Sequence, residues 1–166
     1  AVAREDQALL TSRHGGGFPM TRVLSGADVA AQINEAHPGA STEWNATDVW
    51  VEPASLLQVA GFLKESSDLD FSFLTAISAV DYVDHFELVY HLLSMRQNHS
   101  VVLKTRRYGR EKPVIDSLTP VWKGANLQER EIWDLMGVHF EGHPNMKRIL
   151  LWEDFPGHPL RKDFVR

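Results

Sequence analysis

Hydrophobic residues spaced three or four apart predict two short helices in the first half of the chain. The first covers residues 26–36, with Ser25 as its N-cap and Pro38 just beyond its end. The second covers residues 53–65 and begins with Pro53, which fits the first turn of a helix. Their apolar faces consist of Ala27, Ala30, Ala31, Ile33, Leu56, Leu57, Ala60 and Leu63.

Runs of β-branched and aromatic residues predict four strands around these helices. One strand lies between the helices, at residues 48–52, and three follow one another with short connections at 71–77, 86–93 and 100–105. Consecutive strands joined in this way are typical of an antiparallel meander. The order of elements predicts an α+β fold, a two-layer domain with the helices packed on one face of a mixed β-sheet.

The pattern changes in the last third of the chain. Thr119 and Pro120 form a helix-start signal, and helical spacing then runs to Met136, where Gly137 is placed to end the helix in a left-handed conformation. Asn126, with Glu129 three residues later, could begin a second helix inside this stretch, so the pattern fits one helix or two. Beyond this point the sequence is rich in glycine, histidine and proline, which predicts an ordered extended segment.

Composition and charge exclude several function classes. The chain has 166 residues and no cysteine, which excludes disulfides, thiolate zinc sites, cysteine-ligated iron–sulfur clusters and cysteine nucleophiles. Its net charge of −5 argues against a nucleic-acid-binding protein. Basic residues are concentrated at Lys104, Arg106, Arg107, Arg110 and Lys112, a run that fits either a solvated hairpin end or a docking patch for an acidic neighbour.

Candidate catalytic groups are sparse. No glycine-rich nucleotide-binding loop is present in the sequence, and no run approaches the ~20 apolar residues of a membrane span. His139, His143 and His158 could form a metal site of a His-dependent metalloenzyme, or each could bond to backbone carbonyls in a turn. Arg130 and Asp134 are four residues apart on the predicted helix and are expected to pair.

The C-terminal third closely resembles one known family. Its sequence reads EREIWDLMGVHFEGHP over residues 129–144, continues as MKRIL over 146–150, and ends as EDFPGHPLRKDF over 153–164. This string is similar to the signature of the 30 kDa subunit family of proton-translocating NADH–quinone oxidoreductase (respiratory complex I). The signature residues expected to be structural are Glu129, Arg130, Glu131, Asp134, Gly137, Gly142, His143, Pro144, Gly157, His158 and Pro159.

The resemblance implies a non-catalytic subunit of the peripheral arm. Such a subunit holds no cofactor itself, and FMN and iron–sulfur clusters are expected in partner subunits that pass electrons from NADH to quinone. The implied partners in this hetero-oligomer are the quinone-site subunit, which is similar to the hydrogenase large subunit, and neighbouring iron–sulfur subunits. The implied location is peripheral, on the cytoplasmic side of a bacterial cell membrane or on the matrix or stromal side in organelles. Similar subunits occur in membrane-bound hydrogenase-type complexes, which is the alternative assignment.

We therefore expect three parts in the chain. Residues 1–22, which include three consecutive glycines, form a flexible lead-in, residues 23–118 form the α+β core, and residues 119–166 form the signature helix and a docking segment. Ordering an extended segment costs about 1–2 kcal/mol per residue in backbone entropy, so a partner surface is expected to compensate. The competing interpretation is that the segment folds back and only caps its own sheet. The predicted partner anchors are Arg148, Phe155, Arg161, Lys162 and Phe164.

Overall fold

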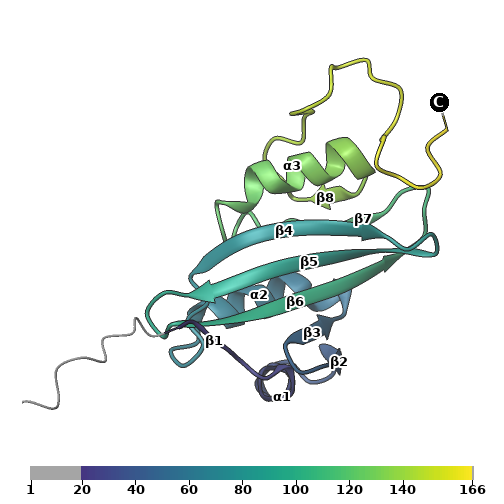
Figure 1. The fold of residues 1–166 in the computed structure, drawn as a ribbon. Coiled ribbons are helices and arrows are strands. Elements are labelled where there is room, and N and C mark those ends of the chain that lie inside the picture. Colours follow the sequence, from purple (N-terminus) through teal and green to yellow (C-terminus); the bar gives the residue numbers. More distant parts are fainter. Residues whose placement is uncertain (1–19, 166) are drawn as a thin grey trace, which may run out of the picture.

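The meander predicted from the sequence forms the centre of the structure. The computed structural model describes residues 20–165, so the predicted lead-in lies almost entirely outside the described residues. Strands β4 (Phe73–Asp81), β5 (His85–Ser94) and β6 (His99–Tyr108) are antiparallel neighbours (Figure 1). Strands β5 and β6 are longer than predicted, because they continue through polar residues at their ends. Strand β4 begins two residues after the predicted start at 71 and continues four residues beyond the predicted end, to Asp81.

Three further strands extend this sheet beyond β6. Strand β3 (Asp48–Val51) pairs with β6 in parallel, as a mixed sheet requires, and β2 (Ser41–Trp44) pairs with β3 antiparallel. Strand β1 (Arg22–Val23) pairs in parallel with the first residues of β6. The sequence did not predict β1 or β2, because both are short and mostly exposed and therefore lack an alternating apolar pattern.

Both predicted N-terminal helices are confirmed. Helix α1 (Gly26–Ala36) has the predicted bounds, and the second helix consists of a 3-10 turn, η1 (Pro53–Ser55), followed by α2 (Leu56–Glu65). Figure 1 shows α2 behind β5 and β6, with α1 beside β2 and β3. The buried residues of the two helices are Gly26, Val29, Ala30, Ile33, Leu56, Val59, Ala60 and Leu63.

The third helix lies along the outer edge of the sheet. Helix α3 (Ala125–Met136) is a single helix that ends, as predicted, at Gly137 with a φ of +74°. Gln128 on this helix accepts a hydrogen bond from the backbone N–H of Ile77 in the edge strand β4, at 2.6 Å. A helix placed in this way covers a strand edge that would otherwise expose unpaired backbone groups.

The residues before α3 form turns that join the core of the sheet. The predicted helix start at Thr119 is therefore wrong by six residues, and the helix begins at Ala125. Trp122 in these turns is buried, and its indole N–H donates to the carbonyl of Phe71 at 3.0 Å. The largest fully buried side chains come from strands, from turns and from the first two helices, and they include Phe71, Phe86, Tyr90, Leu92, Leu103, Leu118, Phe140, Ile33, Leu56 and Leu63.

A short second sheet precedes the C-terminal segment. Strands β7 (Val114–Asp116) and β8 (His139–Glu141) pair in parallel and lie on either side of α3 in the sequence. Residues 142–165, which we call the C-terminal strap, contain no helix or strand, in agreement with the predicted extended segment. Across residues 20–165, none of the helices has the length and apolar character needed to span a membrane.

Candidate docking surface on the C-terminal strap

A buried carboxylate on α3 fixes the middle of the strap. Asp134 is fully buried, and its Oδ2 accepts backbone N–H hydrogen bonds from Ile149 at 3.0 Å, Leu150 at 2.8 Å and Leu151 at 2.9 Å. Three donors converging on one oxygen order a segment that has no regular secondary structure. The strap lies above α3 in Figure 1 for this reason.

Arg148 completes this site. Its Nη1 donates to Oδ1 of Asp134 at 2.7 Å, and its Nη2 donates to the carbonyls of Phe155 and Gly157 at 2.9 and 3.2 Å. Burial alone would raise the pKa of Asp134, but the backbone donors of the strap and the Arg148 guanidinium outweigh it and lower the pKa to about 2. The carboxylate is therefore ionised and paired at neutral pH.

The expected pairing of Arg130 with Asp134 is wrong. Arg130 instead donates to the carbonyls of Lys147 and Arg148, both at 3.0 Å. The carboxylate of Asp134 is buried under the strap, where Arg148 and the strap backbone occupy it. Sequence spacing on one helix could not show this, because the competing partner comes from a different segment.

The signature histidines form hydrogen bonds with backbone groups, and their rings do not converge on a possible metal site. His143 accepts from the Asn145 N–H at Nδ1 and donates from Nε2 to the carbonyl of Asn126, both at 3.0 Å. His158 donates to the carbonyl of Asp134 at 2.9 Å, and His139 is exposed on β8. No group of three or more His, Asp or Glu side chains that could hold a metal ion occurs within residues 20–165.

Two glycines allow the strap to pack closely. A Cβ on Gly137 would come within 2.6 Å of the His158 ring, and a Cβ on Gly157 would come within 2.9 Å of the Phe164 ring. Both glycines also have positive φ, at +74° and +96°. The rings of Phe155 and Phe164 stack at 6.0 Å, so both predicted apolar anchors pack against each other inside the strap.

The first turns of α3 contain a second buried carboxylate. Glu129 accepts hydrogen bonds from the Ser117 hydroxyl at 2.6 Å and from the Leu118 N–H at 2.7 Å. Burial raises the pKa of Glu129 to about 7, against the lowering effect of these two donors. Glu129 therefore ties the turns before α3 to the helix. The single helix of this stretch begins at Ala125, one residue before the start suggested at Asn126.

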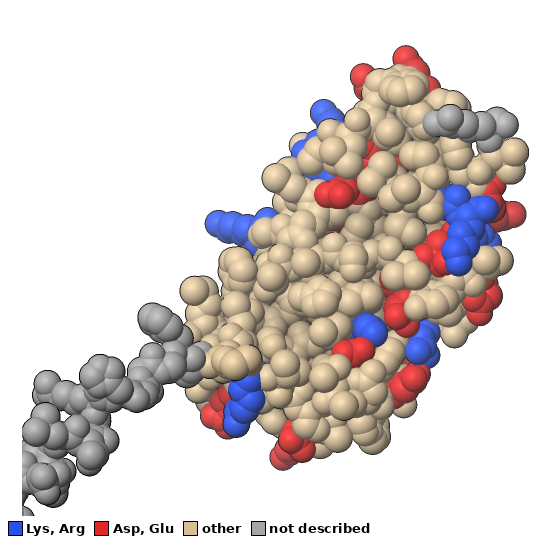
Figure 2. All heavy atoms as spheres, viewed as in Figure 1, with Lys and Arg blue, Asp and Glu red and all other residues tan. Residues whose placement is uncertain are grey.

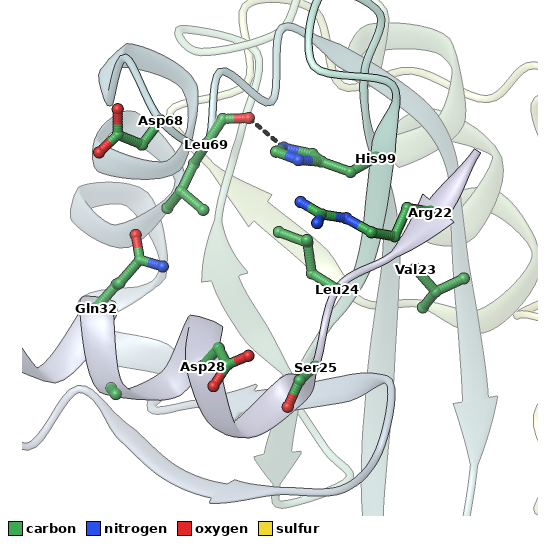
Figure 3. A pocket seen from close by; sticks show the side chains of 10 residues that line it. Arg22, Val23, Leu24, Ser25, Asp28, Gln32, Asp68, Leu69 and His99 are labelled. Atoms are coloured by element: carbon green, nitrogen blue, oxygen red, sulfur yellow. Dashed lines mark hydrogen bonds between the residues drawn. The ribbon is translucent and has the colours of Figure 1, made fainter. Parts of the chain in front are cut away.

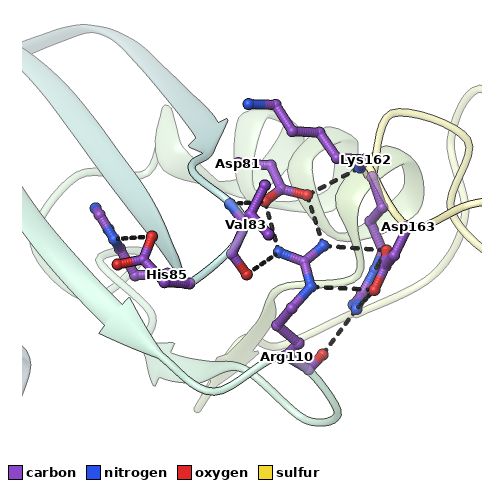
Figure 4. A network of polar contacts seen from close by, with 8 residues as sticks. Asp81, Val83, His85, Arg110, Lys162 and Asp163 are labelled. Carbon is purple, nitrogen blue, oxygen red and sulfur yellow. Dashed lines mark hydrogen bonds and ion pairs between the residues drawn. The ribbon is translucent and has the colours of Figure 1, made fainter.

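A four-residue network, which we call the terminal lock, fixes the far end of the strap (Figure 4). Arg110 donates to both oxygens of Asp81 at 2.6 and 2.7 Å, and to Asp163 at 3.1 Å. Arg161 donates to Asp163 at 2.9 Å and to the carbonyl of Arg110 at 2.9 Å. The Arg110 guanidinium holds the pKa of Asp81 below its usual range, and Arg161 and Arg110 do the same for the pKa of Asp163.

The predicted charged anchors thus differ in what they can offer a partner. Arg148 and Arg161 are partly buried, and their guanidinium groups bind Asp134 and Asp163 of the same chain. Lys162 donates its backbone N–H to Asp81 at 2.9 Å, while its side chain is exposed and points away from the terminal lock (Figure 4). The strap packs on α3, and its end is bonded to Asp81 at the end of β4 and to Arg110 after β6, so part of it folds back onto its own chain as the competing interpretation expected.

Several large apolar side chains of the strap are exposed. Leu150 is 60% exposed, Trp152 66% and Leu160 58%, although the backbone around them is held by α3 and by the strap itself. Sequence analysis did not select these residues. The pattern that could have indicated them is the alternation of apolar residues with the polar residues that bond the segment to α3. We call Leu150, Trp152 and Leu160, with Lys162, the outer strap surface.

Most of the basic run at the end of β6 is paired within the chain. Lys104 bonds to Asp48 at 2.6 Å, and Arg106 bonds to Glu43 at 2.6 Å and to Glu87 at 3.1 Å. Figure 2 shows Lys and Arg side chains (blue) next to Asp and Glu side chains (red) along one side of the molecule. Internal pairing therefore describes Lys104 and Arg106 better than a free basic patch does.

A hollow beside β1 offers no catalytic arrangement (Figure 3). It is lined by residues that include Arg22, Asp28, Asp68 and His99. The buried His99 donates a hydrogen bond to the carbonyl of Leu69 at 2.6 Å, so its imidazole holds the segment before β4. The outer strap surface is therefore the stronger candidate for function.

Comparison with known proteins agrees with the resemblance carried by the strap. Residues 49–166 match the family described as "Respiratory-chain NADH dehydrogenase, 30 Kd subunit". A subunit of the NADH-quinone oxidoreductase of Roseiflexus castenholzii is 42% identical over 147 residues, which covers 84% of each chain. The mitochondrial NADH dehydrogenase [ubiquinone] iron-sulfur protein 3 of Candida albicans is 44% identical over 119 residues, covering 70% of this chain and 42% of that protein.

A solved structure is also similar. A chain in the structure of the membrane-bound sulfane sulfur reductase, an archaeal respiratory membrane complex, matches with a TM-score of 0.70 and 28% identity. The match covers 84% of this chain and 85% of that chain, so most of the fold is shared. Together with the signature that builds the strap, these findings show that the chain belongs to the family of the 30 kDa subunit of respiratory-chain NADH dehydrogenase, whose members include subunits of NADH-quinone oxidoreductases.

Proposed function

We propose that this chain is a non-catalytic peripheral-arm subunit of an NADH-quinone oxidoreductase and that it binds neighbouring subunits through the outer strap surface. The observation that carries the proposal is a segment that hydrogen bonds fix to α3 and that leaves three large apolar side chains exposed among charged ones. Leu150, Trp152 and Leu160 remain largely exposed while Asp134 and Arg148 hold the backbone beneath them. Exposed tryptophan is enriched among the residues that contribute most to binding at protein interfaces, and a rigid segment loses less entropy on binding.

The hydrogen bonds that order the strap also affect the free energy of binding. An extended segment that folded only on binding would lose about 1–2 kcal/mol per residue in backbone entropy at that step. Here hydrogen bonds within the chain order the strap beforehand, so more of the apolar contact energy is left for binding. Arg148 and Arg161 act as positioning residues of the strap, and Lys162 is the charged group that remains for a partner carboxylate.

The proposed partners follow the family resemblance. The outer strap surface docks to the quinone-site subunit, which resembles the hydrogenase large subunit, and neighbouring iron–sulfur subunits complete the hetero-oligomer. FMN and iron–sulfur clusters in those partners carry electrons from NADH to quinone, coupled to proton translocation. This chain then lies on the cytoplasmic side of a bacterial membrane and supplies structure to the arm.

A related membrane-bound complex is the second candidate. The similarity to a chain of the archaeal sulfane sulfur reductase complex shows that this fold occurs in another respiratory membrane assembly. In such an assembly the same strap would bind the corresponding hydrogenase-like subunit. The two candidates therefore share the docking surface and differ in the electron donor.

Purification of the tagged chain from native membranes under mild detergent tests both candidates. We expect the quinone-site subunit to co-purify, together with a flavin-bearing NADH-oxidising subunit. Co-purification of a hydrogenase-like subunit without the flavin subunit would support the second candidate. Recovery of the tagged chain alone, from membranes in which it is expressed at its natural level, would contradict both.

A further inference from the structure

One arginine of the basic run has no partner. The Nε atom of Arg107 is buried, yet it makes no hydrogen bond, and no ion pair to this side chain occurs within residues 20–165. Its neighbours differ, because Arg106 and Arg110 each pair with two carboxylates. A buried donor left unpaired is unfavourable, and native structures normally supply an acceptor for it.

Arg107 lies in a groove at the end of β3. The groove has a volume of about 400 Å³, and its walls include Trp50, Pro53, Ala54 and Tyr108. The side chain of Tyr108 is 59% exposed. Glu52 also lines the groove, but its carboxylate forms no ion pair with Arg107. The groove thus combines an unpaired cation with aromatic and aliphatic walls.

The backbone along this groove is a free strand edge. The last residue pair between β3 and β6 is Trp50 with Lys104, and in the same register Pro53 would face Arg107. Proline has no N–H to donate, and Pro53 begins η1, so β3 leaves β6 at this point. Residues 106–108 of β6 continue to pair with β5 but have no strand on their other side among the described residues.

We propose that this groove binds an extended, acidic segment of a neighbouring subunit, which pairs with the free edge of β6 and places a carboxylate on Arg107. Strand addition supplies main-chain hydrogen bonds, and side-chain pockets then determine which sequence fits. A carboxylate is the side chain that best complements a guanidinium group, because two parallel hydrogen bonds can form. This site is separate from the outer strap surface, and it rests on the proposed function only in that the segment comes from a subunit of the same complex.

The absence of cysteine in the sequence allows a direct test. A Tyr108→Cys variant places one thiol at the groove, and Glu35→Cys on α1 gives an exposed control outside the groove and the strap. The chains are labelled with a maleimide in the intact, membrane-bound complex and again after dissociation. We expect the cysteine at 108 to react at least about tenfold more slowly in the intact complex than after dissociation. The control cysteine should react at the same rate in both states.

Photo-crosslinking then identifies the occupant and tests the guanidinium contact. A benzophenone amino acid at position 108 should crosslink to a partner peptide that contains Asp or Glu. Arg107→Gln should lower the yield about tenfold, and Arg107→Lys should lower it by a smaller factor, because lysine keeps the charge but cannot form the two parallel hydrogen bonds. Rapid labelling at 108 in the intact complex would overturn the proposal. So would a crosslink to residues 1–19 of the same chain, or to a peptide without acidic residues. In each of these cases co-purification of the subunits would still stand, so the docking function and this inference fail separately.

Discussion

Arg148 donates a hydrogen bond to the buried carboxylate of Asp134 across 2.7 Å, and this contact joins the strap to α3. The two residues lie on opposite sides of β8 in the sequence, so their pairing determines the path of everything between them. The same carboxylate holds the backbone of Ile149, Leu150 and Leu151. The shape of the outer strap surface therefore depends on one ionised side chain beneath it.

Asp134→Asn should release the strap while leaving the sheet intact. The amide keeps one acceptor oxygen but turns an NH2 group toward donors, and it leaves the partly buried Arg148 without its counter-ion. Loss of one partner of a buried pair is expected to destabilise the chain by about 3 kcal/mol. Chemical denaturation measures this loss, and hydrogen exchange should show faster exchange in residues 145–160 than in β5. Unchanged exchange in the strap would contradict its dependence on Asp134.

The same carboxylate predicts an acid-sensitive strap. The pKa of Asp134 is about 2 in the folded chain, below its ordinary value of 3.8. Its contribution to stability is therefore fully present above pH 3.8 and is lost as the pH falls through about 2. The difference in free energy of unfolding between the wild type and Asp134→Asn should shrink over that interval. A constant difference from pH 5 to pH 2 would contradict this assignment.

The raised pKa of Glu129 predicts that the free energy of unfolding falls, rather than rises, as the pH increases toward neutral. Burial raises its pKa from 4.5 to about 7, so the folded chain holds a proton that the unfolded chain releases. This contribution to stability is fully present below pH 4.5 and is lost as the pH rises through about 7. Glu129→Gln should therefore make the unfolding free energy less dependent on pH between 4.5 and about 7. Parallel curves for the two proteins would show that Glu129 does not titrate in this range.

A matched pair of glycine substitutions tests the packing of the strap on the end of α3. Gly137 and Gly142 both have positive φ, at +74° and +78°, but only the first would place a Cβ against a side chain, that of His158. Gly142→Ala should destabilise by ~1 kcal/mol through backbone strain alone, and Gly137→Ala by about twice that. Thermal unfolding measures both. Equal losses would mean that the His158 contact contributes nothing.

Local pattern predicted the elements of this fold well. The bounds of α1, the proline at the start of η1 and the glycine that ends α3 all follow from short-range rules, and the structure confirms them. Strands β1, β7 and β8 were missed because two or three residues carry no periodicity. Their existence depends on pairing with distant segments.

The orientation of the strap side chains could not be predicted from the sequence. Arg148 and Arg161 were selected as partner anchors because they are charged and lie in an extended segment, yet both serve contacts inside the chain. Trp152 was passed over, although it is 66% exposed. Which side of an extended segment faces its own chain depends on tertiary contacts such as that of Asp134 with Leu150, and no residue spacing encodes them.

The most direct test of the docking role compares two exposed side chains of similar size. Leu150→Asp changes the outer strap surface, and Met95→Asp, in the turn after β5, changes a site elsewhere that is at least as exposed, at 73% against 60%. Each tagged variant is purified from native membranes, and the co-purifying quinone-site subunit is quantified, with thermal unfolding of the isolated chains as the folding control. Docking through the strap predicts at least an approximately tenfold loss of the partner for Leu150→Asp, no loss for Met95→Asp, and unchanged melting for both. Full retention of the partner by a correctly folded Leu150→Asp chain would contradict it.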